Sequence, residues 1–245
     1  MVLPLGDENP PGRGPAIVTL AIIAINVAVF VLLQLPSDAF TYGWATIPRE
    51  ITTGRDIVES VRVTVGGQTV VIPEAPGPHP IQLTLLTSMF VHGGWLHLGG
   101  NMLFLWIFGD NVEHTFGRAY YLLFYLAAGI VASLAQIAVQ TNSVIPTLGA
   151  SGAISGVLGA YIVMFPGNRV TVFLFRFLTV VPAVVAIGLW AVLQFVNGFG
   201  AIAVSEQTGG VAYLAHVGGF VFGVVIGLFA RGIGLDRRAR PRRFA

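Results

Sequence analysis

Six apolar stretches, separated by more polar segments, constrain this chain more than any other feature of its sequence. A helix needs about 20 predominantly apolar residues to cross the ~30 Å hydrocarbon core of a bilayer. Helices and closed barrels are the structures that satisfy their backbone hydrogen bonds there. The stretches predict spans at about residues 15–34, 95–109, 119–139, 150–165, 177–197 and 211–230, with an apolar lead-in at 81–91. We therefore expect an all-α integral membrane protein built as a six-transmembrane-helix bundle.

Composition agrees with a membrane protein. Hydrophobic residues make up 55% of the chain and charged residues 10%, and the mean hydropathy is +0.80, far from the balance of a soluble domain. The absence of cysteine excludes disulfides, thiolate metal ligands and a cysteine nucleophile. A signal peptide is an alternative for the first stretch, since Ser37-Asp38-Ala39 resembles a cleavage site, but the length of the stretch and the weakly basic segment before it favour a span.

The distribution of arginine predicts the orientation. With both termini in the cytoplasm, ten of the 13 basic residues lie inside and three lie outside, as the positive-inside rule requires. Six arginines between Arg231 and Arg243 could bind nucleic acid, but after a membrane span an anionic inner leaflet is the favoured partner. We expect a multi-pass protein of the cell membrane with cytoplasmic tails at 1–14 and 233–245 around a membrane domain at 15–232, and no nucleic-acid partner.

The segment from 36 to 80 is too polar to span, because it holds eight charged residues. Val61–Val65 and Thr69–Ile72 alternate in polarity around Gly66-Gly67-Gln68, which predicts a β-hairpin at the membrane surface. The first 14 residues, rich in proline and glycine, are expected to form a disordered or surface tail.

The fourth stretch is too short to cross the bilayer fully. Its 16 residues would cover about 24 Å as a helix, and Pro166-Gly167 ends it. Its start, at Ser151, should therefore lie below the outer surface. The polar loop at 140–149 fits a water-filled cavity there, because irregular backbone at that depth must line a cavity or be buried in protein.

Polar side chains inside the other stretches need an explanation, since each is costly in a membrane. His97 and Asn101 are four residues apart and share a helix face, as do His216 and the glycines at 219, 223 and 227. For any one of these residues, a role in helix packing is a sufficient explanation. Small residues at 152, 156, 159 and 160 would, however, bring the fourth and sixth helices close enough to place His216 beside Ser151.

A serine hydroxyl becomes an effective nucleophile when an adjacent base takes its proton, and His216 could serve as that base. No aspartate or glutamate lies inside the predicted spans: Asp110, Glu113 and Glu206 fall outside them. The sequence therefore predicts a Ser–His dyad with no carboxylate as a third member. Backbone N–H groups at the start of the fourth helix, with His97 and Asn101, could stabilise an oxyanion.

These residues resemble the motifs of the rhomboid family of intramembrane serine proteases. The matching segments are Gly149-Ala150-Ser151-Gly152 (GxSG), Ala215-His216 with Gly219 and Gly223 (AHxxGxxxG), His92, His97 and Asn101 (HxxxxHxxxN), and the acidic turn Glu113-His114-Thr115-Phe116-Gly117. They occur in the family's order and cover roughly half of the predicted membrane core.

The resemblance implies that Ser151 is the nucleophile and His216 the general base, with His97, Asn101 and the Ser151 backbone N–H as the oxyanion hole. It implies hydrolysis of peptide bonds in or near transmembrane segments of membrane-protein substrates, with no metal and no cofactor. The fifth span and the loop at 199–210 would form a gate and a cap. Ser155 stands where some members carry an aromatic residue that stacks on the histidine, and Trp44 and Arg49 are separated where some bacterial members have a Trp-Arg pair.

Three other functions remain open from the sequence. A catalytically inactive relative that binds membrane clients would typically lack the serine or the histidine. A small transporter or channel would use the polar residues to line a path. A metal site built from His92, His97 and His216 would be unusual without a carboxylate or an HExxH pattern.

Overall fold

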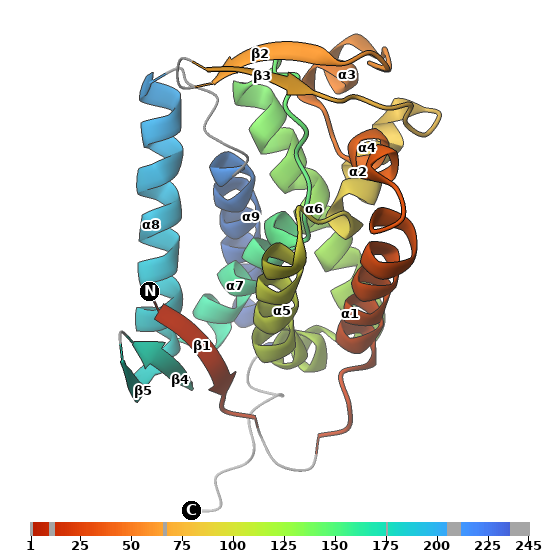
Figure 1. Ribbon diagram of the computed structural model, residues 1–245. Helices are drawn as coiled ribbons and strands as arrows, with labels where there is room; N and C mark the ends of the chain where they lie inside the picture. Colours follow the sequence, from red (N-terminus) through yellow and green to blue (C-terminus); the bar gives the residue numbers. More distant parts are fainter. Residues whose placement is uncertain (1, 10–12, 66–67, 175, 205–211, 236–245) are drawn as a thin grey trace, which may run out of the picture.

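The structure is a computed structural model that describes residues 2–9, 13–65, 68–174, 176–204 and 212–235. It shows a bundle of helices with a small β-sheet near each end (Figure 1). The longer helices are α1 (Ile17–Val29), continued by the π-helical turn η1 (Phe30–Gln34), α5 (Trp95–Phe116), α6 (Arg118–Val139), α7 (Ser151–Met164), α8 (Ala183–Val204) and α9 (Tyr213–Gly232). Each of the six predicted apolar stretches thus contains a helix.

Three helical segments are long and apolar enough to cross a membrane within the described ranges. They are Ile17–Gln34, Arg118–Val139 and Tyr213–Gly232, with mean hydropathies of 2.6, 2.1 and 1.9. The fourth predicted span is the short α7, which has 14 residues and a length of about 21 Å. The chain is therefore a mostly helical membrane protein, and the count of six crossings stays a prediction.

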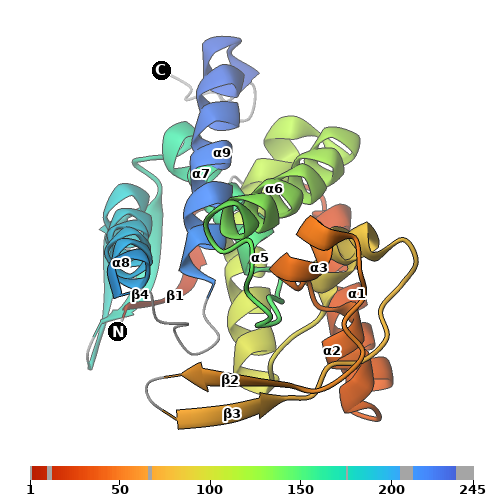
Figure 2. The same ribbon diagram turned by 90° about the horizontal axis from the view of Figure 1, so that it is seen from above.

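Helix α7 lies at the centre of the bundle and packs against α9 (Figure 2). All its residues from Gly152 to Tyr161 are buried. A Cβ atom on Gly223 of α9 would lie 1.9 Å from the carbonyl oxygen of Gly156, and one on Gly219 would lie 2.1 Å from that of Gly152. Backbones this close require glycine, so the expected close contact between these two helices is confirmed.

A three-stranded antiparallel sheet at one end of the bundle corrects the all-α prediction. Its strands are β1 (Val2–Asp7), β4 (Arg169–Leu174) and β5 (Phe177–Pro182), in the order β1-β4-β5. The apolar pattern predicts that the fifth span begins at 177, but residues 177–182 pair with β4 and the helix begins at Ala183. The apolar run is continuous across both elements, so hydropathy alone could not separate the strand from the helix. We call this end of the molecule the sheet end.

The N-terminal residues also differ from the predicted tail. Val2 to Asp7 pair with β4, with Val2 opposite Leu174 and Asp7 opposite Val170. The partner strand is far away in the sequence, which explains why local composition suggested a disordered or surface tail. Residues 236–245 of the predicted basic tail lie outside the described residues.

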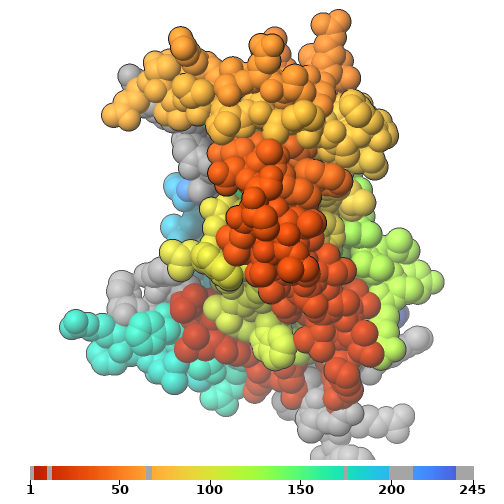
Figure 3. All heavy atoms as spheres, turned by 45° about the vertical axis from the view of Figure 1, so that its right-hand side comes forward, coloured from red at the N-terminus to blue at the C-terminus, as the bar shows by residue number. Residues whose placement is uncertain are grey.

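The connector from 36 to 80 covers the opposite end of the bundle, which we call the connector end (Figure 3). It contains α2 (Asp38–Trp44), α3 (Pro48–Thr53), β2 (Val61–Val65) and β3 (Gln68–Ile72). The last two strands form the predicted antiparallel hairpin, with Val61 opposite Ile72 and Val65 opposite Gln68. Short helical turns η2 (Ile81–Leu83), α4 (Thr84–Thr87) and η3 (Ser88–Phe90) then lead to α5.

Helix α5 runs further than predicted, to Phe116 and not to residue 109, so Asp110 and Glu113 belong to its last two turns. Glu113 is 2% exposed and its carboxylate accepts hydrogen bonds from the N–H groups of Val18 and Thr19 at 3.0 and 2.8 Å. A carboxylate supplied by another helix therefore caps the start of α1, where backbone N–H groups lack partners.

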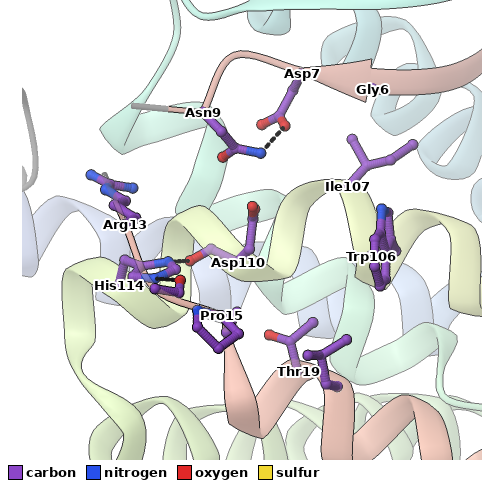
Figure 4. Close-up of a pocket in the computed structure, with 13 residues that line it drawn as sticks. Gly6, Asp7, Asn9, Arg13, Pro15, Thr19, Trp106, Ile107, Asp110 and His114 are labelled. Carbon is purple, nitrogen blue, oxygen red and sulfur yellow. Dashed lines mark hydrogen bonds between the residues drawn. The ribbon is translucent and has the colours of Figure 1, made fainter. Parts of the chain in front are cut away.

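A dense group of hydrogen bonds joins the N-terminal segment to the sheet ends of α5 and α7. Asn111 donates to Asp7 at 2.9 Å and to Asn9 at 2.8 Å, and it accepts from Arg13 at 2.9 Å. Tyr161 of α7 donates to Asp7 at 2.5 Å. Burial raises the pKa of Asp7 from 3.8 to about 7. A cavity of about 380 Å³ opens beside this group, between the N-terminal segment and α5 (Figure 4).

Candidate active site

Ser151 and His216 are in direct contact, as the sequence predicted. Ser151 is the first residue of α7, and His216 lies in the first turn of α9. The distance from Nε2 of His216 to Oγ of Ser151 is 2.7 Å. The glycine contacts between α7 and α9 begin one residue after Ser151, so the backbone packing of these helices sets the position of both side chains.

The other ring nitrogen of His216 has a partner that the sequence reading missed. Nδ1 lies 2.8 Å from Oε1 of Gln194, on α8. An amide oxygen accepts, so Nδ1 carries the proton and Nε2 is left to accept from the Ser151 hydroxyl. The available signal was an amide side chain inside the apolar stretch at 177–197, where a polar residue needs a partner.

The surroundings of His216 also show what replaces the aromatic residue four positions after the serine. Ser155 at that position donates to the carbonyl oxygen of Ser151 at 2.6 Å. The aromatic neighbours of His216 come from α8 and from α9 itself. Trp190 of α8 lies 6.1 Å from the imidazole between ring centroids, and Tyr213 of α9 lies 6.5 Å away in an edge contact.

His97 and Asn101 lie beside Gly149, two residues before Ser151. A Cβ atom on Gly149, whose φ is +116°, would lie 2.8 Å from Nε2 of His97 and 3.6 Å from Nδ2 of Asn101. The N–H of Gly93 donates to Nδ1 of His97 at 3.2 Å, so the ring proton of neutral His97 is on Nε2. Nδ2 of Asn101 is buried and has no hydrogen-bond partner among the described residues. Two side-chain donors therefore face the backbone that leads into Ser151.

The connector fixes the loop that carries Gly149. The N–H of Gly149 donates to the carbonyl oxygen of Ser88 at 2.9 Å, and Thr46 and Thr147 form a two-way backbone bridge at 2.9 and 2.8 Å. The hydroxyl of Thr46 also lies within hydrogen-bond distance of Oγ of Ser88, at 2.9 Å. The connector thus contacts the loop before Ser151 through Thr46. The sequence did not suggest that the connector would help to position this loop.

Two further glutamines, whose roles the sequence did not reveal, form hydrogen bonds with backbone groups next to the site. The side-chain amide of Gln34 donates to the carbonyl oxygen of His92 and accepts from its N–H, both at 2.9 Å. Oε1 of Gln136 accepts from the N–H of Ala215, next to His216, at 3.2 Å. Both glutamines lie near the ends of apolar stretches, where their spacing carried no motif.

His92 belongs to the wall of the site and does not join the dyad. Its ring packs edge to face against His97, with centroids 5.2 Å apart. Within the described ranges, no group of three or more His, Asp or Glu residues could hold a metal ion. The predicted alternative of a metal site at His92, His97 and His216 therefore gains no support from the geometry.

The site thus combines a serine, a histidine and adjacent hydrogen-bond donors at the start of a helix, which is an arrangement that serine hydrolases use. A family model, the Rhomboid domain, matches residues 81–232, which is more than half of the chain. The chain therefore belongs to the rhomboid family, as its motifs suggested.

Several curated relatives carry the family name. Rhomboid protein 1, mitochondrial, from Saccharomyces cerevisiae is 30% identical over 219 residues, covering 88% of this chain and 54% of that protein. Rhomboid protease GluP from Bacillus subtilis is 38% identical over 145 residues, covering 59% and 26%. The human presenilin-associated rhomboid-like protein, mitochondrial, is 26% identical over 211 residues, covering 83% and 45%. The chain spans about half or less of the length of these relatives.

Proposed function

We propose that this chain is an intramembrane serine endopeptidase that hydrolyses peptide bonds in or near transmembrane segments of membrane proteins. The observation that carries the proposal is the 2.7 Å contact between Nε2 of His216 and Oγ of Ser151, within a chain of the rhomboid family. A hydroxyl bonded to an unprotonated imidazole nitrogen is the pair that nucleophilic catalysis requires.

The reaction follows from the positions of the protons. His216 removes the hydroxyl proton as Oγ of Ser151 attacks the scissile carbonyl, and the carbonyl oxygen becomes an oxyanion. Nε2–H of His97, Nδ2 of Asn101 and the free N–H groups in the first turn of α7 stabilise that charge. Protonated His216 then gives its proton to the leaving amine. His216 then takes a proton from a water molecule as that water attacks the acyl-enzyme, and it returns the proton to Oγ of Ser151 as the acid product leaves.

The proposed arrangement in the membrane rests on the distribution of arginine. We expect six crossings, with the sheet end and both termini in the cytoplasm, because this orientation places ten of the 13 arginines inside. The connector end then faces outward, and water reaches Ser151 past the polar loop at 140–149. Helix α8 and the loop predicted at 199–210 are expected to act as gate and cap. Residues 199–204 of that predicted loop instead belong to α8, and residues 205–210 lie outside the described residues. The chemistry needs no metal or cofactor.

Cleavage of single-span substrates in proteoliposomes tests the proposal. We expect the wild-type protein to cut members of a panel of single-span proteins and Ser151→Ala to cut none. The melting temperature of Ser151→Ala should equal that of wild type. Cleavage that persists in Ser151→Ala would overturn the dyad. A wild-type protein that cuts no member and instead transports solute would favour the alternative of a transporter.

A further inference from the structure

We propose that Gln194 is a positioning residue, whose amide oxygen fixes the proton on Nδ1 of His216 and takes the place of the acidic member of a catalytic triad. The inference rests on the proposed function, because it assumes that His216 acts as the base. Its basis is the 2.8 Å distance between Oε1 of Gln194 and Nδ1 of His216, on the side of the ring opposite Ser151.

The position of the proton on neutral imidazole decides whether His216 can act. Neutral imidazole carries one N–H, and only the form with the proton on Nδ1 leaves Nε2 free to accept from Ser151. An acceptor at Nδ1 selects that form. In serine proteases with an aspartate, losing this acceptor costs a large factor in rate because the ring adopts the wrong tautomer.

Gln194 is the acceptor that the described residues provide. None of their carboxylates hydrogen-bonds to His216. A neutral amide oxygen can hold the tautomer without placing a second charge inside the bilayer, where an ionised carboxylate would be costly. It stabilises the protonated ring less than a carboxylate would, so a carboxylate at this position should favour protonation of His216.

The packing of α8 directs Gln194 toward the dyad. Trp190, one turn earlier on the same face, lies 6.1 Å from the rings of both His216 and Phe220. Val192 and Val196, on the other side of the helix, are exposed. The bond to His216 is the only side-chain hydrogen bond that α8 makes within the described ranges. Correct orientation of the imidazole therefore depends on α8 resting against α9.

Simple adhesion between helices is the competing explanation, since amide side chains often join neighbouring membrane helices. The two explanations differ in one measurable property. A glutamine that only joins helices affects thermal stability and leaves the pH dependence of kcat unchanged. A glutamine that sets the protonation of His216 alters kcat and its pH dependence when the acceptor changes.

The test compares Gln194→Leu and Gln194→Glu with Asn197→Leu, a matched amide-to-leucine change at an exposed position of α8. Cleavage in proteoliposomes gives kcat and KM across pH, beside wild type and Ser151→Ala. We expect Gln194→Leu to lower kcat by roughly ten- to a hundredfold with KM little changed, the size of effect seen for residues that orient a metal-binding histidine through its second ring nitrogen. Asn197→Leu should match wild type.

Gln194→Glu gives the sharper result, because it keeps an acceptor at Nδ1 and adds a charge that favours the protonated ring. The acidic limb of its kcat profile should move to higher pH by about one unit or more, with activity retained on the alkaline side. An unmoved limb in Gln194→Glu, or an unchanged kcat in Gln194→Leu, would overturn the inference even where wild type cleaves and Ser151→Ala does not. Cleavage by Ser151→Ala would instead refute the proposed function itself.

Discussion

Two asparagines of α5 are both buried, yet their surroundings are opposite. Asn111, at the sheet end, is 1% exposed and its side chain exchanges hydrogen bonds with Asp7, Asn9 and Arg13. Asn101, at the connector end, is 8% exposed, and its Nδ2 atom has no partner among the described residues. A buried donor without a partner lowers stability, so natural proteins retain such groups mainly where they have a function.

The contrast extends to the rest of each end. At the sheet end the N-terminal segment, α1, α5 and α7 are linked by several bonds, including those of Glu113 and Tyr161. At the connector end, the bonds of Gln34 and Thr46 hold backbone segments in place, and Ser151, His216 and Gln194 form a separate chain of bonds. Under the proposed function, the hydrogen bonds of the sheet end serve stability, whereas Nδ2 of Asn101 at the connector end stays available for the reaction.

Replacing Asn101 tests this comparison with the largest expected effect. Asn101→Ala should lower kcat by about 10²–10³, as for other oxyanion donors, and leave the melting temperature unchanged or slightly raised because an unpaired donor is removed. Substrate cleavage and thermal unfolding measure the two properties. A large drop in melting temperature with kcat intact would show that Asn101 is structural.

The contact between α7 and α9 lies between the two ends and should control both. Gly223→Ala would place a methyl group against the carbonyl of Gly156, at 1.9 Å before any relaxation. We expect a loss of about 1–3 kcal/mol or more of unfolding free energy, together with loss of cleavage, because the helices must separate. Gly188→Ala in α8 is the matched control, since a Cβ there has no neighbour within 4 Å. Equal stability of the two variants would contradict the close packing.

Asn111→Ala should reverse the pattern of Asn101→Ala. Removing the side chain leaves Asp7, Asn9 and Arg13 without this partner, which should cost about 1–3 kcal/mol of stability. The kcat of the protein that remains folded should change little, because Ser151 is at the other end of α7. Denaturation and cleavage assays at a temperature below unfolding measure both. A strong fall in kcat without loss of stability would mean that the two ends are coupled.

Asp7 gives the smallest expected effect, a dependence of stability on pH. Its pKa in the folded protein is raised to about 7 from 3.8, mainly by burial, so the folded state holds the proton more tightly. The resulting stabilisation is complete below about pH 4 and is lost as the pH rises through about 7. The melting temperature of wild type should therefore fall over this range more than that of Asp7→Asn.

The comparison with Asp7→Asn isolates this effect from other carboxyl groups. Burial also raises the pKa of Glu50 to about 7 and of Glu74 to about 8 in the connector, and both remain in the variant. A decline of equal size in wild type and Asp7→Asn would show that Asp7 does not contribute.

Local patterns predicted much of the fold because they act through local physics. The apolar stretches predicted where the helices lie, and the Gly-Gly turn predicted the β2–β3 hairpin. The spacing of the glycines predicted the contact between α7 and α9 that brings Ser151 to His216. The pairing of Val2–Asp7 with β4 was missed because it depends on segments far apart in the chain. Gln194 was missed because a single amide side chain forms no sequence motif. Its role depends on a contact with His216 of another helix.

Labelling with a mechanism-based serine reagent tests the central claim most directly, since it reports a reaction of the hydroxyl itself. The account predicts modification of wild-type protein at Ser151, located by mass spectrometry, and loss of labelling in His216→Ala although that variant remains folded. Labelling of His216→Ala at the wild-type rate, or modification of a different serine, would contradict the assignment of Ser151 and His216 as a catalytic pair.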